Sequence, residues 1–546
     1  MPALLLTLLA AVTRALAMPG WFGSGAWPLI FIAVALRFLA WRKGQRLWVD
    51  YLGGVVFWCF TFSFLTNINP SAVAGAGAVF GASLILGSCW WVEGILFRLI
   101  HRRLGAGTAA LLALPTAEYL RMTWFYLGVG GVPWASLGLA LEPSFFYPYA
   151  RVFGEFGLLL LATTGGVLLA TLRSPSDRRL PALTFGGLLL LGAPFLSAPA
   201  TEERSLRCLT IQPNVSVEDK NILMDANQFF AVQFRETNKA FVAGEEPDVL
   251  LWAETMWPYP TMEREAQGFM SRPWPFKPDE VRTTEFVQER QRDMAEFVLR
   301  LAPEHTYFLT GAHFYYPITE EELGQKQSVR NTEFVLFDHD GSLVEHFSKQ
   351  ELVPFGEYLP FGGAFPGAEA LSKSVHEATG LRPDFDRTDR TGPLPAVDGL
   401  PSLGGVVCWE NMFEAPFRNQ ANAGAEAVIV LSNEDWFGLK GLEMDQMLAA
   451  SRLRAAESGL ALLRATNTGV TCLVSADGSL EIGLEPGTKG WWGVDLPLKA
   501  DASSPYRSWG WLMAPLWSAL GGLAALLALV LGRPKEQNPP VSPVEA

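Results

Sequence analysis

The sequence contains little charge for its length. Of its 546 residues, 18% are Asp, Glu, Lys or Arg, whereas a globular protein averages about 25%. Apolar residues make up 49% and the mean hydropathy is positive, +0.19, so apolar residues must be gathered into long runs. This balance excludes intrinsic disorder and a coiled coil. It predicts a membrane protein with a substantial soluble part.

Positive charge and cysteine are also scarce. The net charge is -13, which argues against a nucleic-acid-binding protein, because such proteins carry basic surfaces. The five cysteines form no C-x-x-C pair, so neither a disulfide scaffold, a zinc ribbon nor a redox pair is expected. No Gly-rich phosphate loop and no metal-ligand spacing occurs in the sequence, so we expect neither a cofactor nor a metal.

Long apolar runs lie in the first 200 residues and the last 40. A transmembrane helix needs about 20 mostly apolar residues. Eight candidate spans cover roughly 2–17, 24–41, 50–66, 74–98, 105–124, 152–172, 180–198 and 509–532. The first is also compatible with a cleaved signal peptide, because Ala15-Leu16-Ala17 resembles a cleavage site, although the positive start of such peptides is missing.

Basic residues fix the expected orientation of these spans. Lys and Arg cluster after the second, fourth, sixth and eighth spans: Arg42, Lys43, Arg46, Arg98, Arg102, Arg103, Arg173, Arg178, Arg179, Arg533 and Lys535. The loops around 67–73 and 125–150 contain neither residue. Because positive charge stays on the cytoplasmic side, both termini are predicted to be cytoplasmic and residues from about 200 to 508 to lie outside.

Between the apolar regions, short apolar strands alternate with helical patterns. The predicted strands are 208–215, 248–255, 306–316, 332–338, 404–410, 427–434 and 471–480, and the predicted helices are 222–243, 280–302 and 442–459. This alternation predicts an α/β fold with buried strands. The expected organisation is a membrane domain over 1–200, a catalytic domain over 201–505, a C-terminal transmembrane helix over 506–533 and a disordered tail over 534–546.

Two of the predicted strand ends carry ionisable groups. Glu254 follows an apolar strand in LLWAETMWPYP, and Lys349 follows a hairpin built on the turn sequence Asp340-Gly341. Taken singly, a solvated loop glutamate and an edge-strand lysine are the simpler interpretations. Glu357 lies in Pro-Phe-Gly-Glu-Tyr-Leu-Pro, whose two prolines and glycine indicate a rigid loop of fixed shape.

A cysteine lies at a third strand end. Cys408 ends the run GGVVC and precedes Trp409, Glu410 and an expected helix. Backbone N–H groups and the positive helix end lower a cysteine's pKa at such a turn and expose it for attack. The alternative is an inert buried cysteine, which is our interpretation of Cys59 and Cys89 in their spans and of the mid-strand Cys208 and Cys472.

Together these three groups form a coherent catalytic set. The glutamate takes the thiol proton, the lysine stabilises the developing oxyanion, and the thiolate forms an acyl intermediate. A Cys–His arrangement competes with it, but the histidines are poorly placed: His313 and His346 lie in strand-like runs and His305 precedes one.

The motifs around these residues resemble the nitrilase superfamily. The sequence reads W-x-E-T at Glu254, K-x-x-L-V-P-F-G-E-Y from Lys349 and C-W-E from Cys408. The flanking spans narrow the resemblance to the apolipoprotein N-acyltransferase family, which it covers over nearly the whole chain. Further matching motifs are Glu118-x-x-Arg121, Pro133-Trp134, SNEDWFG (432–438) and SRLRAAESGLALLRATNTGVT (451–471).

The resemblance implies a fold, a reaction and a location. The fold is a polytopic α-helical membrane domain of about eight spans plus an α/β nitrilase-like αββα sandwich. The reaction is a ping-pong acyl transfer, without cofactor, from a membrane phospholipid through a Cys thioester to the α-amine of an S-diacylglyceryl-cysteine in an apolipoprotein. The location is the bacterial inner membrane, with the catalytic domain on the periplasmic side.

The resemblance also assigns roles to residues. Glu254 is the general base, Lys349 the oxyanion partner and Cys408 the nucleophile. Glu357 assists the site, while Trp409, where the family commonly has Tyr, and Glu410 position it. The family usually has Gln near Val217, an aromatic residue at Asn221 and His at Met447, whereas Lys220 agrees with its pattern, so the details of lipid or peptide contact are open.

Aromatic, proline-rich segments surround the predicted site. They are MWPYPT (256–261), FMSRPWPFKP (269–278) and LPFGGAFPGAEAL (359–371). Exposed aromatic loops suit a membrane interface, and Trp257 or Phe361 are candidates for admitting the lipoprotein. Ordinary packing of these loops is an equal alternative.

Two other functions remain compatible with the sequence. A membrane-tethered nitrilase-type amidase would discharge the same acyl-enzyme with water, but eight spans exceed what a tether needs. A catalytically silent scaffold is expected to have lost one of Glu254, Lys349 and Cys408, and all three are present.

The charge pattern makes a testable topology prediction. A reporter that is active only in the periplasm should be silent when fused after Ala546 and active when fused near Ala200. The reverse pattern of reporter activity would overturn the predicted orientation.

Overall fold

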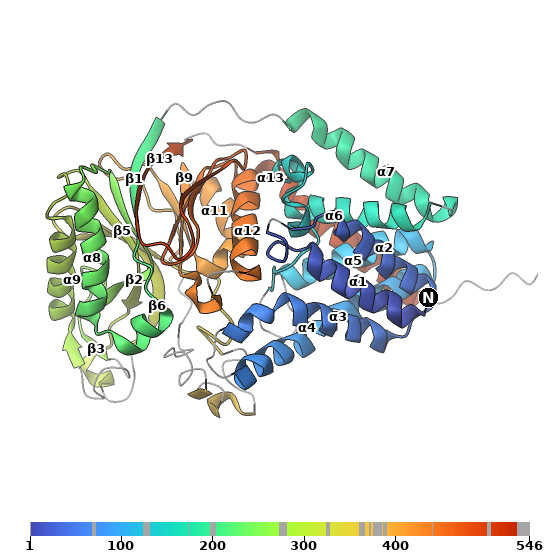
Figure 1. Ribbon diagram of the computed structural model, residues 1–546, viewed down its shortest axis with the longest axis horizontal. Coiled ribbons are helices and arrows are strands. Elements are labelled where there is room, and N and C mark those ends of the chain that lie inside the picture. The colour runs from blue at the N-terminus through green and yellow to red at the C-terminus, as the bar shows by residue number, and fades with distance from the viewer. Residues whose placement is uncertain are drawn as a thin grey trace, which may run out of the picture.

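Figure 1 shows the computed structural model, in which a bundle of helices lies at one end and an α/β unit at the other. The structure describes residues 2–23, 25–67, 72–123, 131–172, 174–196, 204–271, 281–323, 328–359, 366–370, 373–374, 385, 390–438, 441–499 and 504–531. Phe361 and most of the segment 359–371 lie outside the described residues.

Each of the eight predicted apolar segments forms a helix. The helices are α1 (Ala3–Ala17), α2 (Leu29–Arg42), α3 (Leu47–Thr61), α4 (Ala72–His101), α5 (Ala106–Thr123), α6 (Ala150–Ala170), α7 (Pro175–Gly192) and α14 (Met513–Val530). Within the described residues, three stretches are long and apolar enough to cross a membrane, namely Gly75–His101, Tyr147–Ala170 and Gly510–Val530. The number of crossings and their direction stay predictions.

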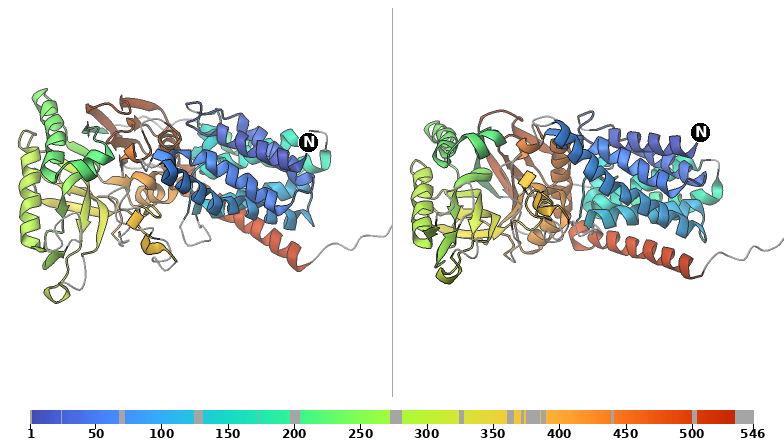
Figure 2. Two further views of the ribbon diagram at one scale, coloured as in Figure 1. Left: turned by 60° about the horizontal axis from the view of Figure 1, so that its bottom comes forward. Right: turned by 90° about the horizontal axis from the view of Figure 1, so that it is seen from below.

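The last helix returns to the bundle that the first 200 residues form. Figure 2 shows α14 along the side of the bundle. The indole Nε1 of Trp517 donates a hydrogen bond to the carbonyl of Leu111 on α5, at 3.1 Å. The outward residues of α14 are exposed leucines, among them Leu516, Leu520 and Leu523, as expected for a helix that faces lipid.

The α/β unit contains two large sheets. The first has the order β13-β1-β2-β5-β6-β7 and the second β12-β11-β10-β9-β8. The strands are β1 (Arg204–Gln212), β2 (Val249–Thr261), β5 (Tyr307–Tyr315), β6 (Arg330–Phe337), β7 (Leu343–Ser348), β8 (Leu403–Val407), β9 (Ala427–Ser432), β10 (Leu462–Thr466), β11 (Thr471–Val474), β12 (Leu480–Leu484) and β13 (Gly490–Leu498). A small third sheet pairs β3 (Phe269–Ser271) with β4 (Val281–Thr283).

The two large sheets pack face to face between two layers of helices. Leu251, Leu309, Ile429 and Leu463 belong to one apolar core shared by both sheets. Helices α8 (Ala226–Val242) and α9 (Thr284–Leu299) cover the outer face of the first sheet. Helices α11 (Glu414–Asn422) and α12 (Leu442–Ser458) cover the second sheet on the side of the helix bundle. The predicted αββα sandwich is therefore confirmed.

Most predicted strands and helices agree with the structure, with three corrections. The strand predicted over 404–410 ends at Val407, because the chain turns into a 3-10 helix at Cys408. The strand predicted over 471–480 is two strands, β11 and β12, joined by a turn. Trp257 was expected in an exposed loop, but it lies in β2 and is 1% exposed, packed against Trp252, Tyr259 and Phe337.

Helix α12 joins the sandwich to the helix bundle. Leu453 and Ala450 pack in the apolar core of the bundle, and Arg454 pairs with Glu155 of α6 and, at 2.8 Å, with Glu457 of its own helix. The Glu457 carboxylate also accepts a hydrogen bond from the backbone N–H of Glu155, at 2.6 Å. These charges are buried, and their mutual pairing fixes the two parts against each other.

Removal of Arg454 should therefore destabilise the protein. Arg454→Met leaves two carboxylates buried without their cation, which typically costs about 3–5 kcal/mol. Lys239→Met is the matched control: its partner is Glu236 at 3.0 Å, and the lysine side chain is 54% exposed, so a loss of less than about 1 kcal/mol is expected. Unfolding of the purified variants in detergent measures both, and equal losses would contradict the role of Arg454.

Candidate active site

The structure brings Glu254, Lys349 and Glu357 together. The Lys349 ammonium lies 2.7 Å from Oε1 of Glu357 and 3.5 Å from Oε1 of Glu254, and its side chain is only 1% exposed. Burial alone would lower the pKa of Lys349, but the adjacent Glu357 and Glu254 carboxylates raise it above the ordinary value. Lys349 is therefore a permanently charged ammonium between two carboxylates.

Glu254 is held where strand β2 departs from regular geometry. The pairing of β2 with β5 shifts register between Trp252 and Trp257, and Thr255 has a φ of +49°. On β5, a Cβ at Gly311 would lie 3.0 Å from the Glu254 Cα, so this close approach requires glycine. The backbone N–H of Asn433, at the end of β9, donates to Oε2 of Glu254 at 3.1 Å.

Glu357 lies in a loop that folds back on itself, as its prolines and glycine predicted. Its second oxygen accepts a hydrogen bond from the backbone N–H of Val353 at 2.8 Å, and its own N–H donates to the Val353 carbonyl at 2.9 Å. Phe355 adopts a φ of +65°. The loop thus fixes one carboxylate oxygen on the backbone and the other on Lys349.

Cys408 starts a 3-10 helix (Cys408–Met412) at the carboxyl end of β8, with a φ of +51°. Two residues on, the Glu410 carboxylate accepts backbone hydrogen bonds from Val407 at 2.9 Å, Gln350 at 2.6 Å and Glu351 at 3.1 Å. Burial raises the pKa of Glu410 to about 7, and these N–H donors oppose the rise. Glu410 therefore ties the cysteine turn to the segment that follows Lys349.

The pKa of the Cys408 thiol is raised, whereas the strand-to-helix turn in the sequence predicted a lowered pKa. Burial, and then the negative charge of Glu254, raise its pKa well above the ordinary value, while Lys349 lowers it. The expectation of a lowered pKa was wrong, because desolvation and a neighbouring carboxylate outweigh the backbone N–H groups. The Cys408 thiol is therefore harder to ionise than a free cysteine, and the charges of Glu254 and Lys349 act on it in opposite directions.

Trp409 connects the cysteine turn to the helix bundle. Its ring lies 5.8 Å from that of Trp134 and 5.6 Å from that of Phe413, measured between centroids. The carbonyl of Trp134 accepts a hydrogen bond from Arg121 at 2.8 Å, and Arg121 pairs with Glu118 at 2.7 Å inside the bundle. The Glu118-x-x-Arg121 and Pro133-Trp134 motifs therefore hold Trp134 in place, and Trp134 in turn contacts Trp409, which follows Cys408.

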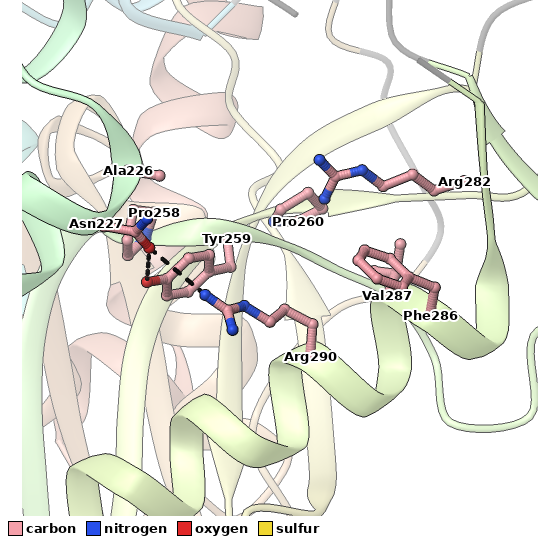
Figure 3. Close-up of a pocket in the computed structure, with 9 residues that line it drawn as sticks. All are labelled: Ala226, Asn227, Pro258, Tyr259, Pro260, Arg282, Phe286, Val287 and Arg290. Carbon is pink, nitrogen blue, oxygen red and sulfur yellow. Dashed lines mark hydrogen bonds between the residues drawn. The ribbon is translucent and has the colours of Figure 1, made fainter.

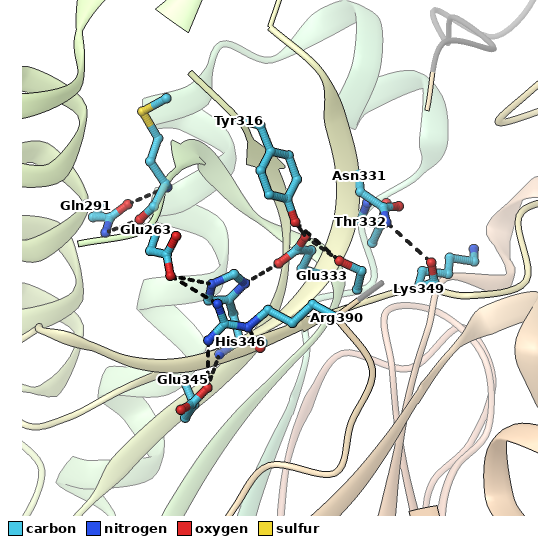
Figure 4. Close-up of polar contacts among 12 residues, drawn as sticks. Glu263, Gln291, Tyr316, Asn331, Thr332, Glu333, Glu345, His346, Lys349 and Arg390 are labelled. Carbon is cyan, nitrogen blue, oxygen red and sulfur yellow. Dashed lines mark hydrogen bonds and ion pairs between the residues drawn. The ribbon is translucent and has the colours of Figure 1, made fainter. Parts of the chain in front are cut away.

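A buried polar network lies behind Lys349 (Figure 4). The backbone of Lys349 is hydrogen bonded to Thr332 at 3.0 Å and to the amide of Asn331 at 3.3 Å. His346 places Nδ1 2.5 Å from Glu333 and stacks on Phe314 at 4.1 Å. Because His346 contacts Glu333 and Phe314, it is not a candidate partner for Cys408.

Two further residues lie near the site although the sequence patterns gave them little or no role. Lys220 was noted only for its agreement with a motif, yet its ammonium donates a hydrogen bond to the hydroxyl of Thr255, next to Glu254. Burial lowers the pKa of Lys220 to about 8, although Glu254 and Cys408 act to raise it. The second is Glu443, a buried carboxyl at the start of α12 whose ionised form acts to raise the pKa of Cys408.

A separate cavity of about 190 Å³ opens elsewhere on the α/β unit (Figure 3). It lies between the end of β2, the start of α8 and α9, and its lining includes Tyr259, Arg282 and Arg290. None of the predicted site residues lines it. Among the residues that the structure describes, no group of His, Cys, Asp and Glu could hold a metal ion.

Known proteins are similar in sequence to most of this chain. A carbon-nitrogen hydrolase family model matches residues 249–502. An apolipoprotein N-acyltransferase from Bradyrhizobium diazoefficiens is 28% identical over 79% of this chain and 74% of its own length. One from Rhodopseudomonas palustris is 26% identical over 97% of this chain and 95% of its own. Among solved structures, an amidase from Nesterenkonia sp. is 17% identical over 57% of this chain and 96% of its own, with a TM-score of 0.36.

The raised pKa of Cys408 makes a prediction for alkylation. At neutral pH the resting thiol should react with iodoacetamide more slowly than a free cysteine, and its rate should rise with pH to a midpoint above about 8.5. Mass spectrometry of the Cys408 peptide across a pH series measures this rate separately from the other cysteines. A midpoint well below that of a free cysteine would restore the thiolate expected from the sequence.

Proposed function

Because this chain belongs to the apolipoprotein N-acyltransferase family within the carbon-nitrogen hydrolase superfamily, we propose that it completes the acylation of lipoproteins. It transfers an acyl chain from a membrane phospholipid to the N-terminal α-amine of a diacylated apolipoprotein. The observation that carries the proposal is the buried Lys349 between two carboxylates, next to the turn of Cys408.

The first half-reaction loads Cys408. Glu254 takes the thiol proton as the sulfur attacks the ester carbonyl of the phospholipid, and Lys349 stabilises the oxyanion of the tetrahedral state. When this state collapses, the C–O bond breaks and Glu254 returns the proton to the leaving lysophospholipid oxygen. A thioester on Cys408 remains, and Glu254 is again a carboxylate.

The second half-reaction discharges the thioester to an amine. The amine nitrogen attacks the thioester carbonyl, Lys349 again stabilises the oxyanion, and the C–S bond breaks to give an amide. Because an α-amino group is largely protonated at neutral pH, the acceptor loses two protons overall. One re-forms the Cys408 thiol through Glu254, and the other leaves to water.

The arrangement of the chain suits substrates that stay in a membrane. The sandwich joins the helix bundle on the side of α12 and of the cysteine turn, through Arg454 and Trp409. A site on this side of the sandwich can receive lipids that remain anchored by their acyl chains. We place the catalytic part on the periplasmic side of the inner membrane, in agreement with the distribution of Lys and Arg.

A labelled acyl donor tests this function. Incubation of the purified enzyme with phospholipid that carries isotopically labelled chains should add one acyl mass to the Cys408 peptide. A diacylated lipopeptide should then remove this mass and acquire the label as an amide. Release of labelled free fatty acid at the same rate with or without lipopeptide would favour a hydrolase instead.

The nucleophile has a matched set of controls. Cys408→Ser should form no thioester and lose turnover, because a hydroxyl is barely ionised and Glu254 is too weak a base to compensate. Cys208→Ser and Cys472→Ser should keep the chemistry, since both thiols are buried in strands away from the reacting groups. Wild-type turnover by Cys408→Ser would contradict the mechanism.

Lys349 should act in both half-reactions. Lys349→Ala should slow thioester formation by about 10²–10³, the usual cost of a lost oxyanion contact. Lys349→Arg should not restore the rate, because a planar guanidinium does not fit the compact position between Glu254 and Glu357. Single-turnover measurement of loading and discharge tests this, and normal loading in Lys349→Ala would make the lysine purely structural.

A further inference from the structure

Glu443 is a buried carboxyl that the proposed mechanism does not use. It lies in the first turn of α12 and is 3% exposed. Its Oε2 is buried and has no hydrogen-bond partner among the residues that the structure describes. Since buried polar atoms are nearly always paired in native proteins, an orphaned carboxyl oxygen calls for an explanation.

Helix α12 holds Glu443 beside the reacting groups. Asn411 of the cysteine turn donates a hydrogen bond to the carbonyl of Met447 at 2.7 Å and accepts one from Ser451 at 2.9 Å. Strand β9, which pairs with β8, ends next to the Asn433 N–H that donates to Glu254. Helix α12 is thus bonded to the cysteine turn at Met447, one turn after Glu443, and the charges of Glu443, Cys408 and Glu254 interact.

Among the described residues, no salt bridge joins Glu443 to a cation, and its nearest charges are mostly negative. Burial and the carboxylates of Glu434, Asp445 and Glu254 raise the pKa of Glu443 well above its ordinary value, and Arg464 lowers it. Arg464, however, is already paired with Glu434, and both side chains are fully buried. Glu443 therefore favours its neutral form more than an ordinary carboxyl does, in an environment that would accept one more positive charge.

A second unpaired group lies next to the general base. The side-chain oxygen of Asn433 accepts a hydrogen bond from the amide of Asn467 at 2.9 Å, which orients its Nδ2 as a donor. This Nδ2 is buried and has no partner among the described residues. An unpaired donor and an unpaired acid therefore lie on the segments that surround Glu254. The acid can accept hydrogen bonds from a cationic substrate group, whereas the amide of Asn433 can donate only to a substrate oxygen.

We propose that Glu443 binds the α-ammonium group of the acyl acceptor, which is a peptide with a free N-terminus. This inference rests on the proposed function and identifies how the same site receives its second substrate. An approaching cation favours the charged form of a carboxyl, so a proton held by Glu443 leaves to water as the ammonium arrives. The carboxylate then accepts N–H hydrogen bonds from the ammonium, and no covalent bond changes in this step.

The assignment explains why an acid is kept at this position. Loading requires only that the ester carbonyl of the phospholipid reach the thiol, so the first half-reaction needs no carboxylate at Glu443. The acceptor brings a positive charge beside the buried Lys349 ammonium, and a carboxylate offsets the repulsion. Glu443 is accordingly a binding residue for the second half-reaction, whereas Glu254 performs the proton transfers in both.

Glu443→Gln tests the proposal, because glutamine keeps the shape and removes the charge. Cys408 should load from phospholipid at the wild-type rate within about twofold. The lipopeptide concentration that half-saturates discharge of the loaded thioester should rise by about 10- to 100-fold, the usual loss for a charged hydrogen bond. Discharge by hydroxylamine, an amine that is uncharged at neutral pH, should be unchanged.

Two further variants control for structural damage. Asp445→Asn removes a partly buried carboxylate two residues away and should leave lipopeptide half-saturation at the wild-type value. Glu443→Asp keeps the carboxyl and should recover part of the lipopeptide affinity that Glu443→Gln loses. Loading at the normal rate in each variant establishes that the site is folded.

Several results would overturn the assignment. One is a Glu443→Gln enzyme that discharges to lipopeptide with wild-type half-saturation; another is an equal loss towards lipopeptide and hydroxylamine. Either result would remove Glu443 from acceptor binding and leave the proposed function intact. A wild-type thioester that lipopeptide cannot discharge at all would instead remove the proposed function, and this inference with it.

Discussion

The burial of one lysine ammonium is the constraint on which the rest of the site depends. Transfer of a charge from water into a protein costs several kcal/mol, and only well-placed opposite charges offset it. Glu357 and Glu254 supply these charges at 2.7 and 3.5 Å from Lys349. This requirement draws the end of β7, the loop over 353–357 and the irregular part of β2 to one point. Glu410 then fastens the Cys408 turn to the same segment through backbone hydrogen bonds.

The helix bundle and the sandwich share structural elements, so the site has a fixed relation to the bundle. Helix α12 contributes apolar residues to the bundle core and Arg454 to a buried pair with Glu155. The same helix holds Asn411 beside the nucleophile and carries Glu443. The Arg121–Trp134–Trp409 contacts form a second connection. The Arg121–Glu118 pair inside the bundle thus helps to orient the residue after Cys408.

The sequence predicted the elements of the fold and the reactive groups better than their environment. Strand periodicity and turn residues located β1, β2, β5 and β9, because these signals are local. Trp257 was assigned to a loop because aromatic, proline-rich segments look the same in a buried strand and at a membrane interface. The pKa of Cys408 was expected to fall because its turn is visible in the sequence, whereas its burial and the nearness of Glu254 are tertiary. Glu443 escaped notice for the same reason, since no motif marks a carboxyl that becomes buried only through packing.

The central claim, that Glu254 and Lys349 act as one unit on Cys408, is tested most directly by a double-mutant cycle. The measurement is the rate constant for thioester formation in wild type, Glu254→Gln, Lys349→Met and the double variant. Residues that act as a unit are strongly non-additive, so the double variant should load Cys408 no more slowly than the slower single variant. If the two rate losses multiply in the double variant instead, the groups act independently, and the shared charge arrangement proposed here would be contradicted.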